Sequence, residues 1–142
     1  MVKWGLIILA AVAIVAAVYQ QPAVEVVSSP EPIDYTARFA IYTHGTFRVF
    51  TAAMYHNLSA DVFITADNPS LIQVKKAKTT WQYFFETLPF KLDKNCLVTG
   101  TGQTFCTGEE GELSFTLNGA NDPDVLGKVI QPGGELVVSF DR

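Results

Sequence analysis

The sequence has few basic residues, few histidines and few cysteines. Lys and Arg together number 10, against 14 Asp and Glu, which gives a net charge of −4. Proteins that bind nucleic acid need a basic patch or stripe on their surface. This composition therefore excludes nucleic acid as a partner.

The two histidines offer little material for a metal site. His44 and His56 belong to no His-x-His or His-x-x-x-His pattern. A site built on them needs a third ligand, such as Asp34 or Asp61. We therefore expect an exposed turn histidine and a loop histidine with no bound metal, and we keep both only as weak metal-ligand candidates.

The motifs of common catalytic sites are also missing. No serine or cysteine lies in a nucleophile elbow with a plausible base. Gly100-Thr101-Gly102 is not followed by a helix, as a phosphate-binding glycine loop requires. We predict that the protein is not an enzyme and that it has no cofactor.

One long apolar run is present, at the N-terminus. Residues 4–19 contain no charged side chain and follow Lys3. As a helix they span roughly 24 Å, a little less than the ~30 Å hydrocarbon core of a bilayer, and Trp4 and Tyr19 lie where interfacial aromatics are found. We expect residues 1–19 to form a transmembrane anchor in the cell membrane, with a cytoplasmic N-terminus and an extracytoplasmic domain. A cleaved signal peptide is the alternative, and it exports the domain as well.

The remaining chain divides into a linker and an exported domain. Residues 20–34 contain three prolines and no aromatic residue, which predicts a flexible linker. Residues 35–142 predict a β-rich domain, with two hairpins in residues 35–75 and a second part in residues 79–142. The segment between the hairpins contains a glycosylation sequon, which makes Asn57 a candidate acceptor.

Period-two alternation predicts the hairpins. Residues 35–42 alternate in this way, and residues 46–51 return as the partner strand. In this pairing Arg38 and Arg48 face the same, solvent-facing side. The second hairpin pairs residues 61–65 with residues 71–75.

A short helix rich in aromatic residues is predicted to supply a large part of the domain core. Four bulky residues recur at helical spacing and therefore share one face: Trp81, Phe84, Phe85 and Leu88. Thr79 and Gln82 have the spacing of a capping box, and Pro89 prevents another turn. Because so short a helix is marginal alone, we expect its aromatic face to pack on a sheet as core.

Cys96 and Cys106 are predicted to form a disulfide. Each lies five residues from Thr101, so they face each other in a hairpin centred on that residue. Directly opposite Cβ atoms are about 4.5–5.5 Å apart, within reach of a disulfide after a small adjustment. The alternative is a redox dithiol, which lacks both the Cys-x-x-Cys spacing and a neighbouring positive group.

The C-terminal sequence resembles the end of β-grasp (ubiquitin-like) domains. Those domains often close with a strand, an Asn-Gly pair and a glycine turn into the last strand, as residues 113–119 and 130–140 do here. The order hairpin, helix, strands also matches. The resemblance implies an α+β fold: an N-terminal transmembrane helix, then a mainly antiparallel β-domain with one short packed helix.

Nearly all of the exported part resembles uncharacterised membrane-anchored proteins of archaea and some bacteria. The matching features are residues 80–88, Cys96, Cys106 and Asn118-Gly119. Other residues stand where those proteins have histidines in their two hairpins, namely Asp34, Thr36, Phe63, Thr65, Gln73 and Lys75. The resemblance implies that this chain keeps the scaffold and has lost most of any metal site.

These expectations favour a non-catalytic role. We expect a single-pass protein, held in the lipid bilayer by residues 4–19, that serves as an extracytoplasmic accessory subunit and packs against other subunits of a membrane complex. The alternative is an extracytoplasmic metal-handling protein for copper or zinc with a degenerate histidine site. A dithiol redox protein is a third hypothesis.

Overall fold

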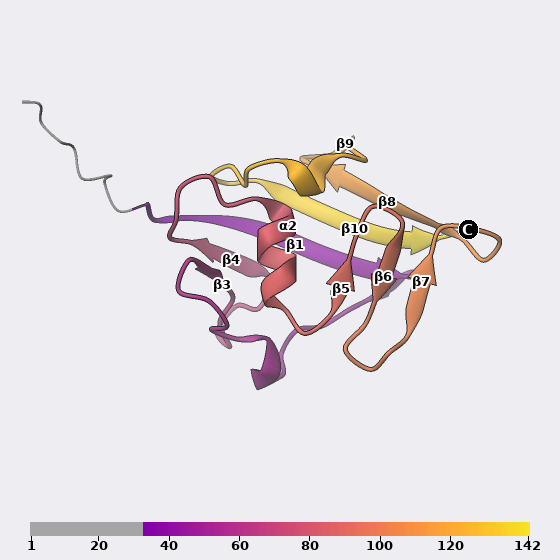
Figure 1. Cartoon of the computed structure of the whole chain (residues 1–142), viewed down its shortest axis with the longest axis horizontal. Coiled ribbons are helices and arrows are strands. Elements are labelled where there is room, and N and C mark those ends of the chain that lie inside the picture. The colour runs from indigo at the N-terminus through magenta and orange to yellow at the C-terminus, as the bar shows by residue number, and fades with distance from the viewer. Residues whose placement is uncertain (1–32) are drawn as a thin grey trace, which may run out of the picture. The chain divides into compact units, whose positions relative to one another are not determined.

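Two long parallel strands form the centre of the fold. The computed structural model describes residues 33–142, in which β1 (Tyr35–Thr43) lies beside β10 (Glu135–Asp141). The pairing runs from Arg38 opposite Glu135 to Thr43 opposite Phe140. Figure 1 shows both strands crossing the domain side by side. The beginning and the end of the described chain are therefore joined in one sheet.

The other strands of this large sheet pair antiparallel to their neighbours. Within the described residues the order is β3-β4-β1-β10-β8-β9, and β2 also pairs with β1. The bounds are β2 Thr46–Phe47, β3 Val62–Phe63, β4 Leu71–Val74, β8 Glu112–Leu117 and β9 Ala120–Asn121. The strands before α2 therefore form one half of the large sheet and the strands after it form the other half, and the two halves meet at the parallel pair β1–β10.

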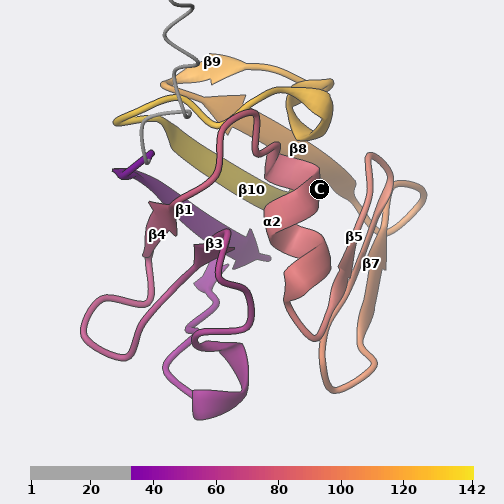
Figure 2. The same ribbon diagram turned by 60° about the vertical axis from the view of Figure 1, so that its left-hand side comes forward.

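A smaller sheet and three short helical segments complete the described chain. The small sheet has the order β5-β6-β7, with β5 Lys91–Leu92, β6 Cys96–Val98 and β7 Thr104–Cys106. The helical segments are α2 (Trp81–Thr87) and the 3-10 turns η1 (Ala53–Tyr55) and η2 (Val125–Gly127). Figure 2 shows α2 on one side of the large sheet, with the small sheet beside it.

The core lies between α2 and the large sheet. Alternate residues of β1, among them Phe39, are buried, as the period-two pattern predicts. On the helix, Trp81, Phe84 and Phe85 are buried as predicted. The Phe39 ring lies 5.2 Å from the Phe84 ring and 5.9 Å from the Phe85 ring, centroid to centroid. Leu88 is also buried, although it is the C-terminal cap of the helix rather than part of it.

The N-terminal cap of α2 is one residue later than predicted. The Thr80 hydroxyl accepts a hydrogen bond from the Tyr83 N–H at 3.1 Å. Thr79 is buried instead, and its hydroxyl donates to the Lys76 carbonyl. The Gln82 side chain does not return to the cap but donates to the Leu92 carbonyl in β5. The predicted Thr79–Gln82 capping box is therefore wrong, because the Thr79 hydroxyl is bound to the Lys76 carbonyl and the Gln82 amide to the Leu92 carbonyl.

The predicted first hairpin is shorter than its pattern suggested. Strand β2 pairs with β1 over two residues. Arg48 then turns toward the α2 side, where its Nε donates to the buried Thr43 hydroxyl at 2.7 Å. Arg38 is exposed and alternates with the buried residues of β1. The prediction that Arg38 and Arg48 face the same side is thus wrong. The second predicted hairpin is present as β3 and β4.

The predicted fold class also needs correction. An α+β, β-grasp-like class with an N-terminal transmembrane helix was expected, but the described residues are mostly β-sheet with α2 as a seven-residue helix. The helix ends at Thr87 because Pro89 disfavours helical geometry in the residue before it. No helix in residues 33–142 is long and apolar enough to cross a membrane. The anchor predicted at residues 4–19 and most of the linker predicted at residues 20–34 lie outside the described residues.

Candidate functional site

An apolar cleft opens between the segment that follows β2 and the turn that joins β6 to β7. Its volume is about 260 Å³. The inner walls come from residues far apart in the chain, namely Phe50, Tyr55, Phe90 and Leu97. Because Phe50 and Leu97 are buried, these walls belong to the edge of the core rather than to a mobile surface.

Contacts between aromatic rings hold the walls in place. The Phe50 ring meets the Tyr55 ring edge-on at 5.1 Å and lies 5.7 Å from the Phe90 ring, centroid to centroid. The Phe50 carbonyl lies 2.8 Å from His56 Nε2, within hydrogen-bond distance. Aromatic pairs in such arrangements add about 0.5–1.5 kcal/mol each beyond their buried area. The cleft is therefore preformed.

The rim of the cleft exposes three large apolar side chains. Phe47, Val49 and Met54 are 44%, 62% and 51% exposed. Phe47 and Val49 line the opening directly. Met54 lies against Gly100, where an added Cβ would be 3.6 Å from the Met54 Cε. We name these three residues the apolar rim.

Arg48 brings a positive charge to this cleft and is the one charged residue among the described residues that line it. Its Nε donates to Thr43 Oγ1 at 2.7 Å, and its Nη2 donates to Gln103 Oε1 at 3.3 Å. The guanidinium also lies over the Phe105 ring, 5.3 Å from its centroid. Among residues 33–142 no carboxylate forms an ion pair with Arg48. The charge is held in place but not neutralised.

A second, larger cleft of about 730 Å³ adjoins the first. The two share Phe90, Thr99 and Gly100. The second cleft runs along the C-terminal end of α2 and carries both Glu86 and Lys91. The two clefts together form a longer surface whose apolar, positively charged end is at Arg48.

The structure does not gather the predicted metal ligands into a site. His44 is exposed in the turn after β1, and its ring packs edge-on against the Phe140 ring at 5.2 Å. His56 is engaged with the Phe50 carbonyl in the cleft wall. Asp34 pairs with Lys75 at 2.6 Å, and Asp61 accepts a hydrogen bond from Tyr83.

No group of three His, Cys, Asp or Glu side chains within residues 33–142 is arranged to hold a metal ion. In the part of the chain that the structure describes, the metal-handling hypothesis therefore gains no support.

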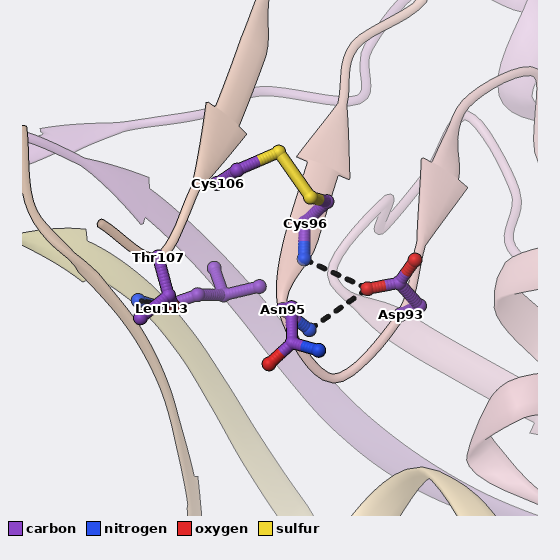
Figure 3. Close-up of a disulfide and its surroundings, with 6 residues drawn as sticks. All are labelled: Asp93, Asn95, Cys96, Cys106, Thr107 and Leu113. Carbon is purple, nitrogen blue, oxygen red and sulfur yellow. Dashed lines mark hydrogen bonds between the residues drawn. A yellow bond between two sulfur atoms is a disulfide. The ribbon is translucent and has the colours of Figure 1, made fainter.

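The predicted disulfide between Cys96 and Cys106 is present (Figure 3). The two residues are directly opposite in β6 and β7, with Cα atoms 4.1 Å apart. Asp93 shapes the turn that precedes β6, because its Oδ1 accepts the N–H groups of Asn95 and Cys96, each at 2.8 Å. The bond lies at the start of the same hairpin whose far turn forms the cleft.

The predicted glycosylation acceptor, Asn57, is exposed and follows the rim segment in the chain. It has a positive φ of 55°, and its backbone N–H donates to the Ile64 carbonyl at 3.0 Å. The use of Asn57 as a glycosylation acceptor stays a prediction.

Sequence reasoning missed the cleft. Most of its residues come from segment 46–55, of which residues 46–51 were predicted as a strand, from Phe90 and from the turn at residues 99–101, and no pattern in the sequence indicates that these segments meet. The available signal was the density of large apolar residues in segment 47–55. Comparison of the chain with protein-family models, with curated proteins and with solved structures finds no match. The resemblance to membrane-anchored proteins stays a prediction.

Proposed function

We propose that residues 33–142 form a non-catalytic interaction domain, located outside the cytoplasm, that binds a partner protein over the apolar rim. The observation that carries this proposal is the exposure of Phe47, Val49 and Met54 around a recessed, preformed cleft.

The chemistry of this surface is typical of an interface. Large apolar patches are uncommon on the surfaces of monomeric proteins and mark sites of interaction when polar residues surround them. Interfaces are enriched in aromatic residues, Met and Arg, and these are the residue types present here: Phe47 and Tyr55, Met54, and Arg48. A recessed aromatic pocket beside exposed apolar groups is also the usual setting of a binding hot spot.

The location outside the cytoplasm is supported by the disulfide. Disulfides persist in oxidising compartments and are rare in the cytosol, and the Cys96–Cys106 bond closes a hairpin in the middle of the domain. The narrower prediction, that the partner is another subunit of a membrane complex, depends on residues 4–19. Those residues lie outside the described part of the chain, so it stays a prediction.

The proposal is tested by co-purification of the full chain from its own cells in mild detergent. Val49→Asp and Met54→Asp place a charge on the rim without touching the core. Val129→Asp is the matched control, since Val129 is 37% exposed and lies beside Thr80 at the start of α2. We expect the unmodified chain and the control to retain a stoichiometric partner that both rim variants lose. A chain that purifies alone at every concentration, or rim variants that keep the partner, would contradict the proposal.

A further inference from the structure

The cleft combines an apolar pocket with a fixed guanidinium that forms no ion pair within residues 33–142. We infer that it binds the C-terminal residue of a partner protein, with the apolar side chain of that residue among Phe50, Tyr55 and Phe90 and its terminal carboxylate on Arg48. This inference rests on the proposed function, because the bound C-terminus would belong to the partner.

The first step concerns the orientation of Arg48. An arginine has five N–H donors in a rigid, planar fork, and two of these are used here, on Thr43 and Gln103. The Phe105 ring supports one face of the guanidinium at 5.3 Å. The remaining donors have no hydrogen-bond partner among residues 33–142, and a carboxylate is the group that such a fork binds in a bidentate manner.

The second step concerns charge. The described carboxylates that form ion pairs are bound to lysines, as in the pair of Lys75 with Asp34. Arg48 is half-buried beside apolar groups, where an unpaired charge is more costly than at an open surface. A carboxylate that enters the cleft therefore gains a partner and also relieves this cost.

The third step concerns size. The cleft volume of about 260 Å³ is slightly below the roughly 300–1,000 Å³ that is typical of pockets for small molecules and cofactors. This space suits one large apolar side chain. A side-chain carboxylate of Asp or Glu brings no apolar group with it. At a chain terminus, in contrast, an apolar side chain and a carboxylate are attached to the same Cα.

The fourth step concerns the path of the preceding residues. The larger cleft shares Phe90, Thr99 and Gly100 with the first, so the residues that precede the C-terminal one have a neighbouring cleft toward which to extend. The hydroxyls of Thr99 and Thr101 lie 3.1 Å apart in the turn at this junction. They supply polar partners for a peptide backbone as it crosses from one cleft to the other.

The experiment measures binding of a fluorescein-labelled hexapeptide that ends in phenylalanine to the full chain in mild detergent. The same peptide with a C-terminal amide is the first control, because it keeps the side chain and removes the charge. We expect amidation to weaken binding about tenfold or more, the loss expected when a charge-assisted hydrogen bond is removed. This comparison uses the unmodified protein and does not depend on the folding of any variant.

Arginine variants locate the carboxylate. Arg48→Gln is expected to weaken binding of the acid peptide about tenfold or more and to abolish its advantage over the amide. Arg38→Gln is the matched control, since Arg38 is exposed on the other side of β1, and it should leave both affinities unchanged.

Two results would overturn the inference. One is equal binding of the acid and amide peptides, and the other is no binding at millimolar peptide. If either occurs while the partner still co-purifies with the chain, the inference fails and the proposed function stands. If the rim variants keep the partner but the acid peptide binds through Arg48, the proposed function fails and the carboxylate site stands.

Discussion

The ring of Phe84 stands edge-on against the ring of Phe39, with the centroids 5.2 Å apart and the planes at 70°. This contact joins the middle of α2 to the middle of β1, and both side chains are buried. It fixes the position of the helix on the sheet.

Phe84→Ala is expected to destabilise the domain by about 3–5 kcal/mol, because it leaves a cavity between helix and sheet. Urea unfolding followed by circular dichroism measures the loss. Trp81→Phe is the comparison variant. It keeps a buried ring and removes Nε1, a buried donor with no hydrogen-bond partner among the described residues, so its loss should be clearly smaller. A negligible loss for Phe84→Ala would show that the helix does not dock in this way.

Thr80→Ala tests the position of the helix cap. Removal of the hydroxyl that accepts from the Tyr83 N–H should cost about 1 kcal/mol, the usual effect of losing an N-cap. Thr80→Ser keeps the hydroxyl and should retain most of the stability. Equal losses for both variants in urea unfolding would indicate that the methyl group of Thr80, and not its hydroxyl, is what matters.

The Cys96–Cys106 bond should stabilise the domain by lowering the conformational entropy of the unfolded chain. The two residues are separated by 10 positions, and closing a loop of that size contributes about 2–3 kcal/mol in the chain-entropy model. The double variant Cys96→Ala with Cys106→Ala should therefore unfold at lower urea. Unfolding of the unmodified chain in reductant is the control, and it should approach the double variant. A native thiol count that finds both thiols free would contradict the disulfide itself.

Gly111 is predicted to tolerate no side chain. A Cβ at this position would lie 2.8 Å from the Asp141 carbonyl oxygen and 2.9 Å from the Phe140 ring. Gly111→Ala should therefore cost about 1–3 kcal/mol, the range for overpacking a dense site. Gly127→Ala is the matched control, because no atom lies within 4 Å of its added Cβ, and it should be neutral or slightly stabilising. Equal stability of the two variants in urea would exclude this close approach.

The parts of the fold that could be predicted from the sequence are those that depend on local spacing. The buried face of α2 follows from helical periodicity over Trp81, Phe84 and Phe85. The pairing of Cys96 with Cys106 follows from equal distance to one turn. In both cases the relevant residues are close in the chain, so their spacing in the sequence is enough to predict the helix face and the disulfide.

The central pairing of β1 with β10 could not be predicted in the same way. These two strands are adjacent in space but lie at opposite ends of the described sequence. Parallel pairing of strands so far apart in the chain leaves no turn or spacing signal in the sequence. The position of the helix cap was mispredicted for a different, local reason. Thr79 and Thr80 are equally good cap residues by type, and the buried contact of Thr79 with Lys76 decides between them.

The candidate site was the least predictable part. The cleft is assembled from the segment after β2, from Phe90 and from the β6–β7 turn, which are distant in the sequence and are brought together by the tertiary fold. Exposure of Val49 and Met54 cannot be inferred from their apolar character, which by itself suggests burial. Nor does the charge of Arg48 reveal its orientation, which depends on contacts with Thr43 and Gln103.

Tyr35 should make the stability of the domain depend on alkaline pH. Its hydroxyl donates to the Ile130 carbonyl, and burial raises the pKa of Tyr35 above its ordinary value of 10.0. The folded state therefore holds the proton more tightly than the unfolded state does. The resulting stabilisation is complete below about pH 10, the pKa of an unfolded tyrosine, and it is lost as the pH rises through the higher folded pKa.

The measurement compares the unmodified chain with Tyr35→Phe by urea unfolding from about pH 8 to about pH 11, a range that spans the ordinary pKa of tyrosine. The two proteins differ at position 35 alone, so the difference between their unfolding free energies isolates Tyr35. We expect the unmodified chain to be more stable at the lower pH, because Phe leaves the Ile130 carbonyl without its donor. That advantage should shrink above about pH 10 as the unfolded chain loses the Tyr35 proton. A difference that stays constant to the highest pH would show that Tyr35 is not desolvated in the folded domain.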